Sequence, residues 1–368
     1  MALRVGFDAR AAFLDPHRGF GRVARSLADA LLDALPGRVV LFVPHGAVLP
    51  ARWYPLAKAI VQLRRPRRAS FLVDPLAWRW TLRRHPVDVL HLPAWGVPPG
   101  LEVPVVATFH DATPLRADAA MPRWARARAR MAIRSLPRAT AIHAVSAHAA
   151  AELCALMPNT KDRITVIHHG VAAPFVPEPA VPPRHFLFVG GADPHKNLDV
   201  VLEAYTRDTA RCLPPLVLVG AAGSDPCLGA RLRGLGLRER VEAVGTPDDT
   251  ALASSYRASF ATLVPSRNEG FGLPALEAMA CGCPVVAARA GALPEIAGDA
   301  AILLDPDDVD GWSETLAGLV ANPQQRARLA AAGVARARAF TWSTAARRLE
   351  EVYRAAAGRT GVASDRRG

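Results

Sequence analysis

Short runs of aliphatic and β-branched residues alternate with segments of helical periodicity along the whole chain. This alternation is typical of parallel sheets whose strands are joined by crossover helices. We expect strands near Arg4–Ala9, Val39–Val43, Val87–Leu92, Val105–Phe109, Ala141–Val145, Thr165–His168, Phe186–Val189, Leu216–Val219, Val241–Val244, Ala261–Val264, Val285–Ala287 and Ile302–Leu304. The pattern therefore predicts an α/β protein built from doubly wound sheets.

A proline-rich segment divides this pattern into two halves. Five prolines fall within residues 172–183, where they could join neither a sheet ladder nor a helix interior, so we expect a stiff linker and a boundary near 175–183. The length of 368 residues also favours two domains. We predict Rossmann-like domains at residues 1–175 and 176–342, with strand carboxyl ends facing a shared cleft where ligands of such sheets bind. An amphipathic helix follows at residues 343–358, with Ser343 as its N-cap.

The net charge of +12 is confined to the first half. Residues 1–180 hold 24 Lys and Arg against 12 Asp and Glu, whereas residues 181–368 hold 21 of each. Arginines gather in one cluster at positions 64, 65, 67 and 68 and in a predicted helical segment at positions 123, 126, 128, 130, 134 and 138. Such a surface attracts membrane headgroups, lipid pyrophosphates or nucleic acid, and the alternative is an ordinary solvated face.

The remaining composition predicts a cytoplasmic protein, with a peripheral position at the inner membrane surface as an open alternative. No apolar stretch approaches the roughly 20 residues that span a bilayer, and charge interrupts the first apolar run too early for a signal peptide. The five cysteines form no metal-like set, which favours reduced thiols. Basic and aromatic residues do not interleave as in single-strand binders, so we expect no nucleic-acid partner.

The sharpest chemical signal is the segment Pro265–Met279, which follows a predicted strand and opens a helix. Gly270 and Gly272 would let the backbone approach a ligand closely, and the free N–H groups at the helix start would face an anion. Glu269 and Glu277 lie eight residues apart and could accept hydrogen bonds from sugar hydroxyls at two points of one ligand. The alternative is a strand–loop–helix turn with a capping Glu.

This segment resembles the retaining glycosyltransferases of family 4, which have the GT-B fold and carry a Glu, seven residues and a second Glu. The resemblance continues through residues 280–287 and 293–301. It implies a hexosyltransferase in which Glu277 holds the nucleotide ribose, Glu269 contacts hydroxyls of the donor sugar, and the 270–273 backbone supports sugar and phosphates. In this fold the C-terminal helix crosses back onto the first domain.

A second segment, Val189–Leu198, also follows a strand and enters a helix. The family usually carries Arg-Lys-Asn here, with the Lys neutralising the leaving diphosphate. Lys196 and Asn197 match, whereas His195 replaces the Arg, and its functional equivalence stays open. The Lys-Asn form favours GDP-mannose as donor over a UDP- or dTDP-sugar.

The resemblance also assigns residues in the remaining loops. His110 would lie near the donor sugar and the acceptor as a catalytic residue together with Glu269 and Lys196, and Asp111 and Arg22 would face the acceptor. His143, His168 and His169 are interpreted as structural, and Ser146 as a helix cap. The full set expected to bind the nucleotide sugar is Gly19, Gly21, Lys196, Asn197, Gly245, Thr246, Glu269, Gly270, Phe271, Gly272, Leu273 and Glu277.

Together these features predict a retaining, metal-independent transferase that delivers a hexose to a saccharide or lipid-linked saccharide in surface polysaccharide synthesis. We expect no cofactor. The acidic residues Asp307, Asp308 and Asp310 follow a strand and are interpreted as a turn rather than as a metal–diphosphate motif. Two alternatives stay open: a sugar-nucleotide epimerase on the same fold, which would turn over donor alone, and a non-catalytic polyanion-binding protein.

Overall fold

The chain folds into two compact units. A computed structural model describes residues 2–14, 16, 19–63, 70–94, 96–116, 122–179, 181–191, 193–210, 212–220 and 227–364. The N-terminal unit comprises the described residues of 1–115, 121–170 and 342–368, and the C-terminal unit comprises those of 171–341 with Arg116. The chain thus passes between units after Gly170, five residues before the predicted boundary. Val171 donates to the Phe340 carbonyl and Phe175 packs edge-on against Tyr256, so this stretch belongs to the second unit.

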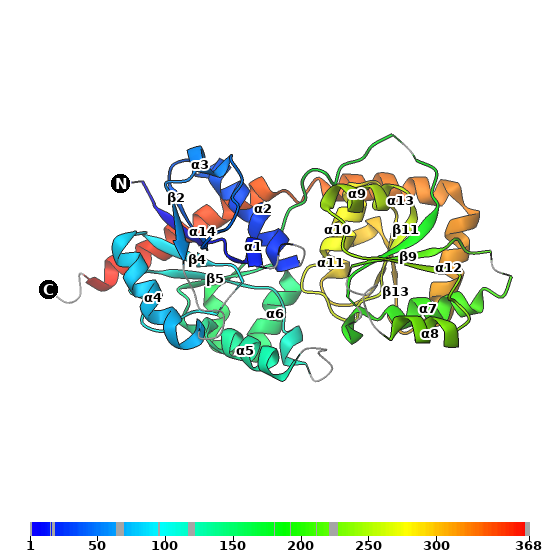
Figure 1. Ribbon diagram of the computed structural model, residues 1–368, viewed down its shortest axis with the longest axis horizontal. Coiled ribbons are helices and arrows are strands. Elements are labelled where there is room, and N and C mark those ends of the chain that lie inside the picture. Colours follow the sequence, from blue (N-terminus) through cyan, green and yellow to red (C-terminus); the bar gives the residue numbers. More distant parts are fainter. Residues whose placement is uncertain are drawn as a thin grey trace. The chain divides into compact units, whose positions relative to one another are not determined.

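The N-terminal unit is a doubly wound parallel sheet with helices on both faces (Figure 1). Its strand order is β3-β2-β1-β4-β5-β6-β7. The strands are β1 (Val5–Asp8), β2 (Val39–Pro44), β3 (Ala59–Leu63), β4 (Val89–Leu92), β5 (Val105–Phe109), β6 (Ala141–Ala144) and β7 (Ile164–Val166), and the helices are α1 (Ala11–Leu14), α2 (Gly19–Ala34), α3 (Trp53–Leu56), α4 (Ser70–Arg84), α5 (Arg123–Arg134), α6 (Ala147–Leu156), α14 (Trp342–Ser364) and the 3₁₀ turns η1 (Thr113–Leu115), η2 (Leu136–Arg138) and η3 (Pro158–Arg163).

The C-terminal unit repeats this architecture with the order β10-β9-β8-β11-β12-β13, again all parallel. Its elements are β8 (His185–Val189), β9 (Leu216–Val219), β10 (Val241–Val244), β11 (Ser259–Val264), β12 (Val285–Ala288), β13 (Ile302–Leu304), α7 (Leu198–Arg207), α8 (Leu228–Gly234), α9 (Asp249–Arg257), α10 (Leu273–Ala280), α11 (Leu293–Ala297), α12 (Val309–Ala321), α13 (Pro323–Ala337) and the 3₁₀ turns η4 (Pro194–Lys196) and η6 (Gly298–Ala300). In both sheets the order reverses beside the first strand, which creates a switch point between β1 and β4 and another between β8 and β11.

Every strand that the hydrophobic pattern predicted is present, but β3 was missed. Among the described strands it pairs only with β2, and of its five residues only Val61 is buried while Gln62 is exposed. An edge strand of this kind lacks the continuous apolar run that marks the central strands.

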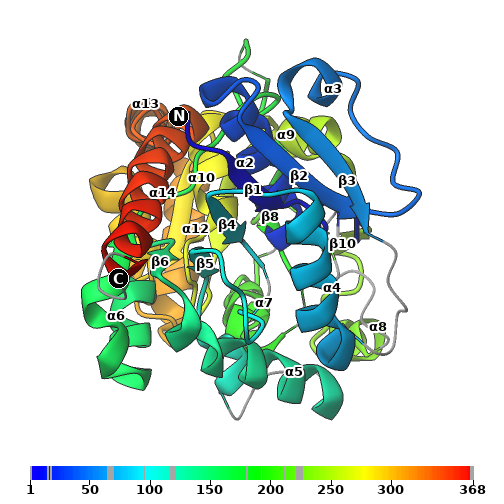
Figure 2. The ribbon, with the colours of Figure 1, turned by 90° about the vertical axis from the view of Figure 1, so that its left-hand side faces the viewer.

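Helix α14 returns to the N-terminal unit and completes its core. Ala346, Leu349 and Tyr353 are fully buried there, at the spacing of one helical face, together with Leu27 and Leu31 of α2. Figure 2 shows α14 on one side of the N-terminal sheet and α4 and α5 on the other. The expected N-cap was wrong, because the helix already begins at Trp342 and Ser343 lies in its first turn.

The basic segments of the first half are only partly described. The cluster at Arg64, Arg65, Arg67 and Arg68 lies outside the described residues. The second arginine-rich segment forms α5 and η2, as its composition predicted. Among the described helices, none combines the length and the apolar character needed to cross a membrane.

Candidate functional site

The carboxyl edge of the C-terminal sheet brings together two residues that lie 73 positions apart in the sequence. Lys196 ends the turn η4 after β8, and Glu269 lies in the loop after β11. Their side chains form an ion pair, with Lys196 Nζ 2.6 Å from Glu269 Oε1. Since β8 and β11 flank the point where the strand order reverses, the pair sits where open α/β sheets bind ligands.

The surroundings of Glu269 keep its carboxylate ionised. Burial acts to raise the pKa of Glu269, but the ammonium of Lys196 and hydrogen bonds from Lys196 and Ser266 outweigh it, so the pKa lies below its ordinary value. Ser266 Oγ donates to the same Oε1 at 2.8 Å. The charge of His195 acts on Glu269 in the same direction, which places this histidine near the pair. Ser266 was not among the site residues predicted from the sequence.

Asn197 has a different role from the one expected of it. Its side chain is fully buried, and Nδ2 donates to the carbonyls of Pro265 at 3.2 Å and Pro306 at 2.6 Å. Its backbone is left-handed, with φ of 54°, and it joins η4 to α7. The Asn197 side chain therefore connects its own turn to the loops that contain Pro265 and Pro306. Because this side chain is buried, a contact between this turn and a nucleotide sugar would have to be made by Lys196.

The loop after β11 leads into α10, so the N-terminus of this helix lies at the carboxyl edge of the C-terminal sheet. Gly272 caps α10 with φ of 96°, a conformation that favours glycine, and an added Cβ would lie 2.8 Å from Leu293 Cδ2. Ala275 and Leu276 make the first hydrogen bonds of the helix, both to the Gly272 carbonyl. The N–H groups of Gly272 and Leu273 precede those bonds, and Pro274 has none to offer, so these two amides suit an anion at the helix start.

Glu277 is buried on α10 and accepts a hydrogen bond from Tyr256, whose hydroxyl lies 3.1 Å from Glu277 Oε2. Helix α10 begins at Leu273, so Glu277 is its fifth residue and lies just beyond the first turn. A buried carboxylate that keeps lone pairs for further donors can still accept hydrogen bonds from vicinal hydroxyls.

One residue of this site, Gly291, had no signal in the sequence. It follows β12 with φ of 60°, and a Cβ built on it would lie 2.5 Å from the Glu269 backbone nitrogen and 2.8 Å from its carbonyl oxygen. The Glu269 carbonyl also accepts the N–H of Ala292 at 2.9 Å. The loop of Glu269 thus packs directly on the backbone of the next loop, which only glycine permits.

We expect Gly291→Ala to weaken nucleotide-sugar binding by about tenfold or more, because a left-handed alanine costs about 1–2 kcal/mol before the clash with the Glu269 backbone is counted. The dissociation constant, measured by calorimetry, checks this. Gly318→Ala in α12, where an added Cβ meets nothing within 4 Å, is the matched control. An unchanged affinity in Gly291→Ala would show that the position of the Glu269 loop does not matter for binding.

Gly245 and Thr246, two members of the set expected to bind the nucleotide sugar, lie in the loop after β10 and are exposed. The Gly245 carbonyl accepts the N–H of Gly220 at 2.9 Å, and Gly220 in turn lies against Gly190. The loops after β8, β9 and β10 are therefore in direct contact at the carboxyl edge of the C-terminal sheet. Of the acidic residues interpreted as a turn, Asp307 lies in the turn before α12 and pairs with Arg267, whereas Asp308 caps α12 and Asp310 is already part of the helix.

In the N-terminal unit, His110 lies directly after β5 and is held by a backbone carbonyl. Its Nε2 donates to the Pro93 carbonyl at 2.7 Å, which leaves Nδ1 as the acceptor of a neutral ring. Burial lowers the pKa of His110, although the Pro93 bond and the charge of Asp111 act in the opposite direction. Asp111 does not orient the ring, because its Oδ1 accepts the N–H of Thr113 in a local turn.

The start of α2 reaches the same place. Phe20 is partly exposed and packs edge-on against the His110 ring with centroids 4.7 Å apart, a contact that the sequence did not suggest. Gly19 and Gly21 lie in the first turn of α2 rather than in a preceding loop, and Arg22 follows in the same turn. The two glycines expected to bind the nucleotide sugar thus belong to a helix start, whose first N–H groups can face an anion.

Behind His110 runs a buried chain of hydrogen bonds whose direction is fixed at one end. His143 Nε2 lies 2.7 Å from the Ile167 carbonyl, which can only accept. Thr108 Oγ1 must then donate to His143 Nδ1, His91 Nε2 to Thr108, and the Tyr353 hydroxyl to His91 Nδ1, at 3.2, 2.8 and 2.6 Å. These directions hold for neutral rings, which burial favours by lowering the pKa of both histidines, and the chain links α14 to β4, β5 and β6.

His169 extends this cluster toward His110, with ring centroids 5.7 Å from His110 and 6.0 Å from His143. Burial lowers the pKa of His143 to about 4 and those of His91 and His169 well below the ordinary value. The structural interpretation of His143 and His169 thus agrees with their burial, and Ser146 caps α6 as expected. His91 is a member of the chain that the sequence analysis overlooked.

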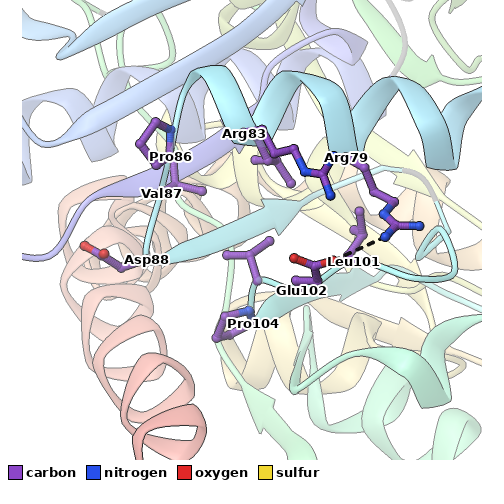
Figure 3. A pocket seen from close by; sticks show the side chains of 10 residues that line it. Arg79, Arg83, Pro86, Val87, Asp88, Leu101, Glu102 and Pro104 are labelled. Atoms are coloured by element: carbon purple, nitrogen blue, oxygen red, sulfur yellow. Dashed lines mark hydrogen bonds and ion pairs between the residues drawn. The ribbon is translucent and has the colours of Figure 1, made fainter. Parts of the chain in front are cut away.

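A recess of about 260 Å³ lies elsewhere on this unit (Figure 3). It is bounded by Arg79 and Arg83 of α4 and by the segments that enter β4 and β5. Figure 3 shows both arginine side chains extending from α4 over Glu102, to which Arg79 is paired at 3.3 Å. Because these segments lie at the amino ends of the strands, the recess is at the opposite edge of the sheet from His110.

Comparison with known proteins identifies the chain. A model of glycosyltransferase family 4 matches residues 17–173, and a model of glycosyl transferases group 1 matches residues 174–336. O-antigen chain mannosyltransferase B of Escherichia coli is 31% identical over 327 residues, covering 84% of this chain and 83% of that protein. The chain belongs to glycosyltransferase family 4.

Solved structures agree with the fold of this family 4 glycosyltransferase. Sucrose-phosphate synthase of Thermosynechococcus elongatus has a TM-score of 0.75 at 22% identity, covering 96% of this chain and 98% of that one. Anabaena HepE, solved in complex with UDP and glucose, has a TM-score of 0.72 at 18% identity, covering 96% and 100%. The predicted GT-B fold class, with its two Rossmann-like domains, is confirmed.

Proposed function

We propose that this glycosyltransferase moves mannose from GDP-mannose, with retention at the anomeric carbon, to a saccharide or lipid-linked saccharide in surface polysaccharide synthesis. The observation that carries the proposal is the Lys196–Glu269 pair at the switch point of the C-terminal sheet, 2.6 Å apart. The name of the E. coli relative, an O-antigen mannosyltransferase, supports the sugar and the pathway class. An anionic membrane surface is proposed as the place where the acceptor is presented.

The pair suits a donor that carries both a diphosphate and a sugar. Lys196 provides an ammonium, held by Glu269, for the charge that develops on the leaving diphosphate, and the amides of Gly272 and Leu273 add fixed donors at a helix start. Glu269, held ionised, accepts hydrogen bonds from hydroxyls of the donor sugar. Glu277 does the same for the ribose while Tyr256 fixes its orientation.

These roles together make transfer possible without a metal ion. The diphosphate leaves as charge on its bridging oxygen grows, and that charge is stabilised by groups that are already in place, which is the most effective form of electrostatic catalysis. In the N-terminal unit, His110 offers a neutral imidazole with Nδ1 as acceptor, suited to a hydroxyl of donor or acceptor. Arg22 and Asp111 are proposed to face the acceptor.

The second candidate donor is a UDP-sugar, because the HepE structures are described as complexes with UDP and with UDP-glucose. A dTDP-sugar is a further alternative. An epimerase on the same fold is also distinct in its chemistry, because it would convert the donor sugar in the absence of any acceptor.

A thermal-shift screen tests the proposal. We expect GDP-mannose at 100 times its dissociation constant to stabilise the protein by about 2.7 kcal/mol, with or without chelator, and UDP- or dTDP-sugars to have little effect. Lys196→Ala should lose the shift, whereas Lys161→Ala, a change at an exposed lysine, should keep it.

Three outcomes would contradict parts of the proposal. A shift with UDP-glucose alone would overturn the donor, and a shift that disappears with chelator would overturn metal independence. Conversion of the donor sugar in the absence of acceptor, followed by NMR, would favour the epimerase.

A further inference from the structure

Helix α5 exposes an apolar stripe beside a basic stripe. Trp124 is 70% exposed and Met131 is 48% exposed, and with exposed Ala127 they follow the i, i+3, i+7 spacing of one helical face. Arg123, Arg130 and Arg134 are also exposed and follow the neighbouring face. Among the residues that the structure describes, no carboxylate pairs with any of these three arginines, and residues 123–138 contain no Asp or Glu.

Helix α4 carries a second stripe of the same kind. Leu76 is 68% exposed and Trp80 is 58% exposed, one helical turn apart. Arg84 lies one turn further on, with its guanidinium carbon 3.7 Å from the centroid of a Trp80 ring. This stacking holds the indole and the charge side by side at the surface, where an arginine stem can lie on the ring while its head faces anions.

The two helices lie on the same face of the N-terminal sheet. Helix α4 connects β3 to β4 and α5 connects β5 to β6, and both connections move along the sheet in the same direction. Right-handed crossovers in one direction place their helices on one face, and Figure 2 draws α4 and α5 on the side of the sheet away from α14. We call the residues Leu76, Trp80, Arg84, Trp124, Arg130 and Met131 the basic-aromatic surface.

We propose that the basic-aromatic surface binds an anionic lipid bilayer, with Trp80 and Trp124 inserted at the level of the headgroups. Tryptophan prefers that level because its ring is apolar and its N–H is polar, and arginines beside it are attracted to anionic headgroups. The exposed Leu76 and Met131 favour a bilayer over a nucleic acid as the anionic partner. Burial of an apolar side chain among acyl chains is favourable, whereas a nucleic-acid backbone offers it no apolar contact. This inference deepens the proposed membrane partner and needs neither donor nor acceptor for its test.

Flotation of the full chain with vesicles of phosphatidylcholine, with and without phosphatidylglycerol, tests the surface. We expect binding to the anionic vesicles only, and release when NaCl is raised, because screening shortens the reach of the arginines. Trp80→Ser with Trp124→Ser should lower the partition coefficient by about tenfold or more, and Arg130→Glu with Arg134→Glu should lower it at least as much. Fluorescence quenching by brominated lipids should be lost in the tryptophan variant.

Matched variants separate this surface from general effects. Leu14→Ser with Tyr54→Ser removes two other exposed apolar residues of the same unit, and Arg328→Glu with Arg338→Glu makes the same change in net charge on the C-terminal unit. Both controls should bind vesicles as the wild type does, and circular dichroism should show all variants folded. Equal binding to neutral vesicles, equal losses in the controls, or retention on nucleic acid but not on vesicles would each overturn the proposal.

Discussion

Replacing Lys196 by alanine should lower kcat/KM for sugar transfer by about a hundredfold to a thousandfold, the usual cost of removing one preorganised donor that stabilises developing charge. Lys196 is the ammonium at the switch point of the C-terminal sheet, and among the described residues its side chain is paired with Glu269. The variant also leaves the buried Glu269 carboxylate with Ser266 as its remaining side-chain donor, which raises its pKa and weakens it as a ligand for hydroxyls.

Initial rates with the donor identified by the thermal-shift screen check this expectation. Glu277→Ala should have a similarly severe effect, whereas Lys161→Ala removes an exposed lysine and should leave the rate unchanged. Melting curves keep loss of fold apart from loss of catalysis. If Lys196→Ala and Glu277→Ala both turn over at a near-normal rate, the site at this edge of the sheet is wrong.

Acid should loosen the N-terminal unit well before the C-terminal one. The pKa of His143 in the fold is about 4, against 6.5 in an unfolded chain. Below pH 6.5, His143 therefore binds a proton in the unfolded chain but stays neutral in the folded chain. This contribution to the free energy of unfolding is complete above pH 6.5 and is lost as the pH falls toward 4. At about 1.36 kcal/mol for each pH unit, His143 alone removes about 2 kcal/mol between pH 6.5 and 5.

His91 and His169 act in the same direction, since burial lowers both of their pKa values well below the ordinary one. The hydrogen-bonded chain explains why His143 and His91 cannot be charged easily: each accepts at Nδ1, and a proton there would break the bond from Thr108 or Tyr353. Hydrogen exchange at pH 7.5 and 5, corrected for the intrinsic rate, should show protection falling in β4, β5 and β6.

The C-terminal sheet is the internal reference for this experiment. Its only histidines among the described residues are His185 and His195, and His185 is only partly buried, so a smaller change is expected there. An equal loss of protection in both sheets would contradict the role assigned to the buried histidines.

The fold could be predicted from the sequence because both sheets are parallel and buried, so their central strands stand out as continuous apolar runs. β3 escaped because it is an edge strand with exposed positions. The predicted boundary between the units lies a few residues too far along the chain. Prolines indicate where a chain is stiff, whereas the contact of Phe175 with Tyr256 shows that this stretch already packs on the second unit. Ser343 suits a cap by composition, yet the burial of α14 already begins one residue earlier, at Trp342.

The site was predicted where a residue's chemistry is carried by its own side chain, and missed where it depends on a neighbour. Lys196 and Glu269 were assigned separately, and the structure adds that they meet. Gly291 could not be found, because its importance comes from the backbone of Glu269, which is distant in sequence. Asn197 matched a family motif, but its side-chain amide donates hydrogen bonds to two backbone carbonyls of the protein itself.

The return of α14 has a consequence for how the protein is made. The helix supplies Tyr353, Leu349 and Ala346 to a core whose other members lie within the first 170 residues, so the second unit is an insertion within the first. During synthesis from the N-terminus, the core of the N-terminal unit therefore stays uncovered on one face until α14 has left the ribosome. The inserted half has all its parts sooner, so the domain that begins second is expected to finish first.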